Sequence, residues 1–398
     1  MVIIVGSGAG GGLLAMEFAL ANIPVTLIEK GPFIKSGDAF KYYDESDEGV
    51  DLLKTSCLGG STLVSAGNGV RTLETDLKDL GIDLSKEFDE IEKLINIHEL
   101  NDSHHGKASK LFLKAGKKLN LNPIKMPKFI EEDKCNQCGN CAFGCPRDAK
   151  WSSKDFIEIA KYHGAEILTN TEVTDLIIEN EIVKGVKALD KDGNNIDLFS
   201  DIVILSAGAI SSAIILQKAG IPAGEKLFTD PFVTVGGVLK DTNLVKEVQM
   251  NALIKKDNFI LSPHYSTLIP KELENVNEKD IFSIMVKIPD DGLGYIKNNK
   301  VVKINSINDS CYISEGSTTA GFILREIGVD PNTIVSTHLR SAHPGGTAAI
   351  GEIVNNHLET KIKGLFVCDA SVLPKSPGSP PILTILALSK KLSKYLIK

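Results

Sequence analysis

Four of the chain's seven cysteines lie close together near its middle. They are Cys135, Cys138, Cys141 and Cys145, with a proline directly after the last. This C-x2-C-x2-C-x3-C-P spacing is typical of a short loop whose thiolates wrap around a four-iron cluster. We therefore predict a [4Fe-4S] cluster at these four residues. A zinc site is the alternative, but zinc sites usually use two separated pairs of ligands.

A second group of residues, at the start of the chain, suits the phosphates of a dinucleotide. Its glycines follow the G-x-G-x-x-G pattern: Gly6, Gly8 and Gly11. They lie between an apolar strand expected at 2–5 and a helix expected at 13–21, where glycine permits a tight turn and close approach of a pyrophosphate. Glu29 follows the next expected strand and is placed to bind the adenosine ribose. The sequence shows one such fingerprint, which favours FAD alone, with NAD(P) as the minor alternative.

The elements that must position these residues change in type along the chain. Residues 73–120 are charged and helical in pattern, whereas β-branched stretches after residue 165 predict strands, with a turn at 192–194. Residues 236–332 alternate polar and apolar side chains with few helix signals, which predicts an antiparallel sheet covering the substrate. A buried strand in GLFVCDA and a last helix entered at Pro380-Pro381 complete the pattern.

The composition is that of an ordinary globular protein. The chain has 398 residues, of which 42% are hydrophobic and 24% charged, with a net charge of −7. These values exclude a disordered chain and give no footprint for nucleic acid, so we expect a small molecule or another protein as partner. The longest uncharged run, 202–217, is too short and too polar to span a bilayer, and the first residues do not resemble a secretory signal. We expect a cytoplasmic protein.

Several separated motifs resemble those of the glucose-methanol-choline (GMC) oxidoreductases, FAD enzymes that oxidise alcohols. Beyond the first fingerprint they are CLGGST at 57–62, ILSAGAI at 204–210, SAHPGGT at 341–347, VCDASVLP at 367–374 and LTI at 383–385. The resemblance implies an α+β/α/β fold with a Rossmann-type FAD-binding domain, an antiparallel-sheet substrate domain and a small iron–sulfur insertion. The expected ranges are 1–75, 151–235 and 336–398 for the FAD-binding domain, 76–150 for the helical insertion with the iron–sulfur motif, and 236–335 for the substrate domain.

The same resemblance implies which residues meet the FAD. Gly59, Gly60 and Ser61 would lie along the flavin, the strand holding Val173 would border the adenine, and Asp369 and Ala370 would meet the ribityl chain and the pyrophosphate. The free N–H groups that begin the last helix, near Leu383 and Thr384, would point at the cofactor. The alternative for this basic helix is a solvent-facing or membrane-facing tail.

The fourth cluster ligand stays open, because in two-cluster proteins the last cysteine of such a run serves the other cluster. We favour Cys145. Cys57 is the runner-up, since its motif places it near the flavin. Cys311 and Cys368 are more often plain buried side chains.

His343 lies in the matched SAHPGGT loop. The resemblance implies that it is the base that takes the hydroxyl proton while hydride moves to the flavin, which suits an imidazole near neutral pH. The family generally has a second His or Asn before the last helix, where this chain has Pro380 and Pro381. We expect that hydrogen bond to be missing or to come from His264 or Tyr265.

Flavin together with a cluster implies that a two-electron hydride is split into single electrons. We therefore predict a GMC-type dehydrogenase that oxidises an alcohol or hydroxy compound and passes electrons through the cluster to a ferredoxin-like or other protein acceptor. The alternatives are the reverse reaction, carbonyl reduction, and a non-catalytic electron-transfer subunit.

Overall fold

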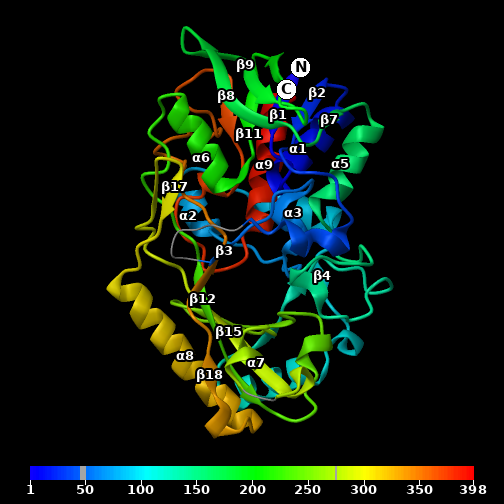
Figure 1. Ribbon diagram of the computed structural model, residues 1–398, viewed down its shortest axis with the longest axis vertical. Coiled ribbons are helices and arrows are strands. Elements are labelled where there is room, and N and C mark those ends of the chain that lie inside the picture. Colours follow the sequence, from blue (N-terminus) through cyan, green and yellow to red (C-terminus); the bar gives the residue numbers. More distant parts are fainter. Residues whose placement is uncertain (45–50, 274–275) are drawn as a thin grey trace.

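Two sheets lie toward opposite ends of the long axis in the computed structural model, which describes residues 1–44, 51–273 and 276–398 (Figure 1). The sheet near the two termini is parallel, and the other is mostly antiparallel. Both sheets of the expected fold class are therefore present.

The parallel sheet is built from short apolar strands. Across the sheet they are β20 (Leu365–Val367), β11 (Val203–Leu205), β1 (Val2–Val5), β2 (Val25–Ile28) and β7 (Glu166–Leu168). Uninterrupted apolar runs are typical of parallel strands that are covered on both faces. The helices beside this sheet are α1 (Ala9–Leu20), α5 (Ser153–Tyr162), α6 (Gly208–Lys218) and α9 (Ile382–Leu396). The βαβ unit predicted at the start of the chain is confirmed.

A three-stranded antiparallel sheet accompanies the parallel one. It consists of β8 (Glu172–Glu179), β9 (Ile182–Leu189) and β10 (Asn195–Phe199). The predicted turn lies between β9 and β10, where the Gly193 N–H donates to the carbonyl of Asp190 at 3.0 Å.

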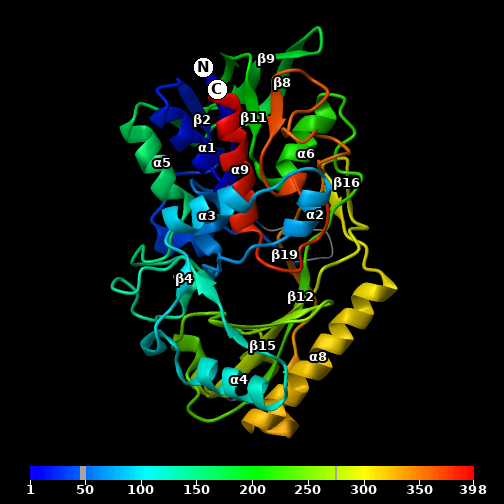
Figure 2. The same cartoon turned by 180° about the vertical axis from the view of Figure 1, so that it is seen from behind.

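The second large sheet has a covered face and a face that borders a cavity. In order its strands are β3 (Asp51–Leu53), β19 (Arg340–Ala342), β12 (Pro231–Val238), β15 (Ile281–Lys287), β14 (Ile260–Pro263), β13 (Ala252–Lys255) and β5 (Ile124–Lys125), with β18 (Val335–Ser336) also paired to β12. Val233 and Ile284 pack in one core with helices α4 (Lys107–Lys118) and α8 (Ile307–Ile327), which lie along the sheet in Figure 2. Their chain neighbours Phe232 and Met285 line the cavity, as the two-residue period of a strand requires.

The long helix α8 was not predicted, because its Ser, Thr and Gly residues weaken the helix signal within the segment expected to be a sheet. Local signals nevertheless set its ends. Ser306 and Asp309 form a reciprocal capping box, and Gly328 ends the helix with φ +93°.

The remaining elements are short. They are α2 (Glu74–Asp79), α3 (Ser85–Leu94), α7 (Ile269–Glu272), β4 (His98–Glu99), β6 (Pro127–Lys128), β16 (Tyr295–Lys297) and β17 (Lys300–Val302). The range expected as an insertion, 76–150, contacts both large sheets or their helices: α3 packs against α9, α4 packs on the antiparallel sheet, and β5 pairs with its strand β13. No helix in the described parts of the chain has both the length and the apolar character needed to cross a membrane.

Candidate functional site

A cavity of about 1240 Å³ has walls from both large sheets. The predicted site residues on its wall are Gly6, Gly8, Glu29, Gly60, Ser61, Val173, His343, Asp369 and Ala370. The predicted site residues that do not line it are Gly11, Gly59, Leu383, Thr384 and the four clustered cysteines, Cys135, Cys138, Cys141 and Cys145. The structure thus brings residues from distant parts of the sequence to one cavity.

The three glycines of the first motif have three different environments. A Cβ on Gly8 would meet nothing within 4 Å, because this residue faces the open cavity. Gly6 has φ +97° and packs against the backbone of Ser206, and Gly11 packs against the carbonyl of Gly6. Gly8 is therefore the glycine that leaves room for a bound group, and the other two shape the turn.

Glu29 is buried at the cavity wall and is fixed by backbone and hydroxyl donors. Its Oε2 accepts from the Ser7 N–H at 3.1 Å and the Ser7 hydroxyl at 2.5 Å, and its Oε1 accepts from the Gly31 N–H at 2.8 Å. Burial raises the pKa of Glu29, while these donors oppose the rise. Ser7, which the sequence did not single out, also accepts from the Gly59 N–H at 2.9 Å. Gly59 does not line the cavity, but its N–H holds the Ser7 hydroxyl that bonds Glu29.

Asp369 collects four donors at the end of β20. Its Oδ2 accepts from the Gly208 N–H at 2.9 Å and the Ser212 hydroxyl at 2.6 Å, and its Oδ1 accepts from the Ser371 N–H and hydroxyl. Burial raises the pKa of Asp369, and these donors oppose the rise. The carboxylate holds the N-terminus of α6 against the cavity.

The start of α9 presents prolines and isoleucines to the cavity, and the prediction about the backbone N–H groups near Leu383 and Thr384 stays untested. The cavity is lined there by Pro380, Pro381, Ile382 and Ile385. Leu383 and Thr384 turn away from it into the core, where the Thr384 hydroxyl donates to the Thr72 carbonyl at 2.9 Å. The helix period places these two side chains on the buried face of α9.

His343 has a geometry suited to proton transfer. Its Nδ1 lies 3.0 Å from Oδ2 of Asp230, whose other oxygen accepts from the Ser376 hydroxyl at 2.5 Å and the Gly378 N–H at 3.1 Å. A carboxylate that accepts from Nδ1–H leaves Nε2 as the nitrogen available to a ligand. The backbone of His343 has φ +63°, an uncommon value for a residue with a side chain, and such values cluster at functional sites.

Lys287 is the second charged neighbour of His343. Its Nζ lies 3.2 Å from the same Nδ1, and its side chain is buried at the cavity wall. Burial lowers the pKa of Lys287 to about 8, although the nearby carboxylates of Asp230 and Asp290 oppose this shift. Burial and the Lys287 charge lower the pKa of His343, whereas Asp230 raises it.

Asp230 and Lys287 were not predicted from the sequence. Each is a lone charged residue within an apolar stretch, and its signal is that a buried charge requires a partner. Asp290 extends the network, since it pairs with Lys303 at 2.7 Å and accepts from the N–H groups of Thr229 and Asp230.

His264 and Tyr265 also line the cavity. Nδ1 of His264 and the hydroxyl of Tyr265 are buried and have no hydrogen-bond partner among the described residues. Burial lowers the pKa of His264 to about 4, so its ring is neutral at neutral pH. Their role in place of the proline positions stays a prediction.

The four clustered cysteines are all half-buried in the loop between β6 and α5. Burial and the nearby thiols of Cys141, Cys145 and Cys138 raise the pKa of Cys135. Within the parts of the chain that the structure describes, no three His, Cys, Asp or Glu side chains form a group arranged to hold a metal ion. The metal site is therefore not confirmed and stays a prediction.

The other three cysteines lie in different surroundings. Cys57 is buried, and burial raises its pKa to about 11. Cys368 is also buried, as expected, and its Sγ lies 3.1 Å from the Ser389 hydroxyl. Cys311 is exposed on α8, which corrects the expectation of a buried side chain.

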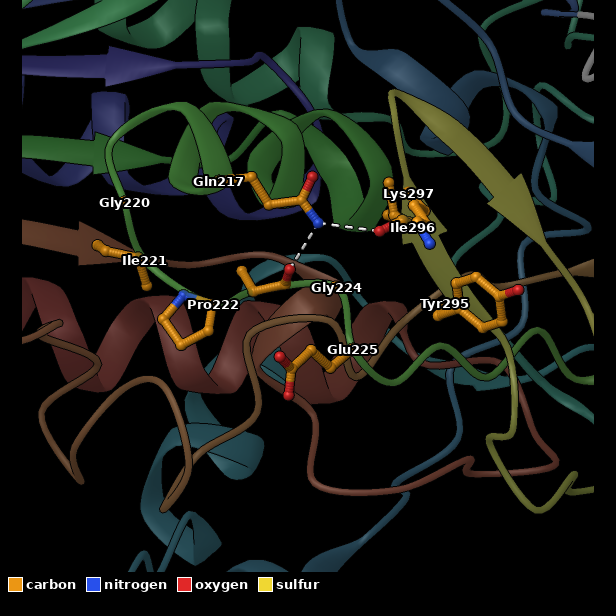
Figure 3. A pocket seen from close by; sticks show the side chains of 10 residues that line it. Gln217, Gly220, Ile221, Pro222, Gly224, Glu225, Tyr295, Ile296 and Lys297 are labelled. Carbon is orange, nitrogen blue, oxygen red and sulfur yellow. Dashed lines mark hydrogen bonds between the residues drawn. The ribbon is translucent and has the colours of Figure 1, made fainter.

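A separate open hollow of about 610 Å³ lies beside α6 (Figure 3). The Gln217 amide crosses it and donates to the carbonyls of Ala223 at 2.8 Å and Ile296 at 3.0 Å. None of the predicted site residues lines this hollow, and its amide is already bonded.

Comparisons with known proteins agree with this arrangement. Two family models, both described as GMC oxidoreductase, match residues 9–242 and 325–389. An uncharacterised protein from Methanocaldococcus jannaschii is 34% identical over 99% of this chain and 99% of its own length. A long-chain-alcohol oxidase of Arabidopsis thaliana is 23% identical over 99% of this chain and 67% of its own length. A formate oxidase of Aspergillus oryzae shares the fold, with a TM-score of 0.80 at 16% identity over 99% of this chain and 97% of that one.

Proposed function

Because the chain belongs to the GMC oxidoreductase family, whose members are FAD-dependent oxidoreductases, we propose that it oxidises an alcohol or hydroxy compound with His343 as base and releases electrons singly through a [4Fe-4S] cluster. The observation that carries the proposal is the pairing of His343 with the buried carboxylate of Asp230 at the cavity wall, 3.0 Å apart. That pairing fixes the ring and leaves Nε2 toward the substrate space.

Removal of a hydride from a carbinol carbon requires that the hydroxyl proton leaves as well. Nε2 of His343 can accept that proton, and Asp230 stabilises the imidazolium that results. Lys287 favours the other tautomer of the His343 ring, because an ammonium that donates to Nδ1 leaves the ring hydrogen on Nε2. A ring with Nε2–H can protonate a carbonyl oxygen, so the Lys287 contact supports carbonyl reduction as the reverse direction of the same site.

The residues around the cavity suit an FAD. Gly8 leaves open space at the N-terminus of α1, where backbone N–H groups and the helix dipole favour a pyrophosphate. Glu29 and Asp369 are buried acceptors at the ends of β2 and β20 that can bond ribose and ribityl hydroxyls. Bound FAD would supply a hydride acceptor beside His343.

The cysteine loop suits an electron exit because it is part of the cavity wall. Gly139, Ala142 and Phe143 of this loop line the cavity. Besides burial, the thiols that act on the pKa of Cys135 are those of its own run, whereas Cys57 is influenced by burial, Glu29 and Lys154. This supports Cys145 as the fourth ligand. A bound cluster would supply one-electron transfer toward a protein acceptor.

Anaerobic purification, metal analysis and a screen of alcohols and aldehydes test the proposal. We expect FAD together with about four irons and four sulfides per chain, and bleaching of the flavin absorbance by at least one alcohol. Stoichiometric zinc would refute the cluster. Bleaching by no alcohol, with electron exchange between protein partners intact, would favour the electron-transfer subunit.

We expect Gly8→Val to abolish FAD binding, because its side chain would fill the space left for the pyrophosphate. The measurement is the ratio of flavin to protein absorbance after purification. Gly321→Val is the matched control: a Cβ there also meets nothing within 4 Å, and the residue lies on α8, away from the cavity wall. Full flavin content in Gly8→Val would refute the assignment of this turn.

We expect Asp230→Asn to slow substrate oxidation by up to about 10⁴-fold, the cost of replacing a carboxylate that orients the imidazole of a catalytic base. Asp230 raises the pKa of His343, so its neutralisation lowers that pKa, and the acid limb of the kcat/KM profile moves to lower pH. The pH profile of both proteins provides the measurement, with Asp197→Asn, an exposed site on β10, as control. A limb that stays in place or moves to higher pH would contradict this pairing.

A further inference from the structure

One buried lysine at the cavity wall has few partners of its own. The side chain of Lys287 is 2% exposed and lines the cavity. Its Nζ has one hydrogen-bond neighbour among the described residues, Nδ1 of His343 at 3.2 Å, and it forms no ion pair with any of them. An ammonium group has three N–H donors, so at least two of them remain available to a ligand.

Other buried lysines of the chain have the partners that Lys287 lacks. The ammonium of Lys303 pairs with the carboxylate of Asp290 at 2.7 Å. Lys128 donates to two carbonyls and an amide oxygen, and Lys150 donates to two carbonyls and a hydroxyl. Because burial of an unpaired charge is unfavourable, the missing partner of Lys287 is expected on the side that it leaves open, which is the cavity.

Lys287 belongs to a row of side chains that crosses three strands of the antiparallel sheet. Phe232 on β12 pairs with Lys287 on β15 at one side and with Arg340 on β19 at the other. Residues that pair directly across neighbouring strands point to the same face of a sheet, and all three line the cavity. Nζ of Lys287 lies 5.3 Å from the centre of the Phe232 ring. The sheet thus presents two cations to the cavity, one on each side of an aromatic ring.

The carboxylates around this row have other partners. Asp230 does not line the cavity, and its oxygens are bonded within the wall as described above. Asp51, on the edge strand β3, lies 3.3 Å from Nε of Arg340, but it is half exposed and also contacts Nε2 of His338 at 3.0 Å. Arg340 is therefore partly compensated, whereas Lys287 has no carboxylate partner in the described parts of the chain.

His264 indicates that the two cations act on the same part of the cavity. Its Nδ1 is buried and has no hydrogen-bond partner among the described residues. Burial is the first cause of its lowered pKa, and the positive charges of Arg340 and Lys287 are the next. This part of the wall therefore combines positive charge with a ring nitrogen that a ligand can bond.

We propose that Lys287, with Arg340 as the second cation, binds a carboxylate of the substrate, so that the alcohol of the proposed function is a 2-hydroxy acid. The inference rests on that function, in which Nε2 of His343 takes the hydroxyl proton. Lys287 contacts the ring of His343, so the two groups that they bind must be neighbours in the substrate. A carboxylate attached to the carbinol carbon meets this condition and accepts charge-assisted hydrogen bonds from an ammonium.

The oxidation balances with such a substrate. The O–H bond of the carbinol breaks and its proton passes to Nε2 of His343, while the C–H bond breaks and its hydride passes with both electrons to the bound FAD. The carbinol carbon becomes the carbonyl of a 2-oxo acid. Since the carboxylate keeps its charge throughout, Lys287 can hold substrate and product alike.

Isothermal titration calorimetry of the FAD-loaded protein tests the site without turnover. The probe is 2-hydroxy-2-methylpropanoate, which has the carboxylate and the hydroxyl but no hydrogen on its carbinol carbon. Its amide has nearly the same shape without the charge. A second acid and amide, with a phenyl group in place of one methyl group, cover larger substrates. We expect the wild type to bind at least one acid about 10–100-fold more tightly than its amide, the contribution of a hydrogen bond to a charged group.

Lys287→Met removes the charge and keeps a long apolar side chain against Phe232. We expect it to weaken acid binding by about 10–100-fold and to leave amide binding nearly unchanged. Lys287→Arg, which keeps the charge, should keep the preference for the acid. Arg340→Met should reduce the preference less, because Asp51 balances part of that charge, and it carries the comparison if Lys287→Met does not fold. Lys255→Met, an exposed site on β13 of the same sheet, is the matched control and should bind as the wild type does.

Equal affinity for acid and amide in both pairs, or equal losses of both in Lys287→Met, would overturn the carboxylate site and leave alcohol oxidation intact. A lower flavin midpoint potential in Lys287→Met, with both affinities unchanged, would also overturn it and assign the lysine to the flavin. Preferential binding of the acid, with no flavin reduction by any alcohol or 2-hydroxy acid, would overturn the proposed function and keep the carboxylate site.

Discussion

His343→Ala should slow flavin reduction by substrate by about 10²–10⁴-fold, the usual cost of removing a positioned general base. The loss should be confined to the chemical step, because His343 is one contact among many on a cavity wall of about 1240 Å³. FAD content and reduction by dithionite should therefore stay as in the wild type. Anaerobic stopped-flow absorbance measures the rate directly.

His163→Ala provides the control, since His163 is exposed at the end of α5. If His343→Ala and the wild type reduce the flavin at the same rate, His343 has no part in proton transfer. The electron-transfer alternative makes a different prediction, in which no alcohol reduces the flavin and the substitution leaves transfer between proteins unchanged.

Cys138→Ser should remove or degrade the iron–sulfur cluster, because serine does not replace a soft thiolate ligand of iron. Iron and acid-labile sulfide analysis of anaerobically purified protein provides the measurement. FAD content should fall much less than iron content, since most of its expected contacts lie on other elements than the cysteine loop.

Three other serine substitutions test which cysteines hold the iron. Cys311→Ser changes an exposed cysteine on α8 and should leave the iron content unchanged. Cys57→Ser should also leave it unchanged if Cys145 is the fourth ligand. Loss of iron in Cys57→Ser together with its retention in Cys145→Ser would reverse that assignment.

The sequence predicted the parts of the fold that have local signals. One short stretch holds the first strand, the glycine turn, the first helix and Glu29. Their relative positions follow from the parallel pairing of β1 with β2 across the helix α1. The last helix was found because two prolines precede it, and both indeed come directly before α9. Membership of the GMC family could be recognised for the same reason, because each of its motifs is a short contiguous segment of the sequence.

The parts that were missed depend on contacts between distant segments. Asp230 and His343 are 113 residues apart, and Lys287 and His343 are 56 apart, so no spacing rule connects them. They meet because β12 has antiparallel neighbours on both sides: β15 places Lys287 opposite Phe232, and β19, which directly precedes His343, places Ser341 opposite Pro231. The burial of the Leu383 and Thr384 side chains likewise depends on distant segments, because the side of α9 that faces the core is decided by its packing against α1 and α3.

Gly139, Ala142 and Phe143 make the cysteine loop a wall of the cavity. Binding in the cavity and the order of the loop are therefore linked thermodynamically, and such coupling is reciprocal. If a metal cluster bound in the loop increases the affinity for a ligand by some free energy, a bound ligand stabilises the loaded loop by the same free energy. Oxidation of the thiols would thus lower the affinity of the cavity for its ligand. A saturating ligand would in turn protect the loop against proteolysis.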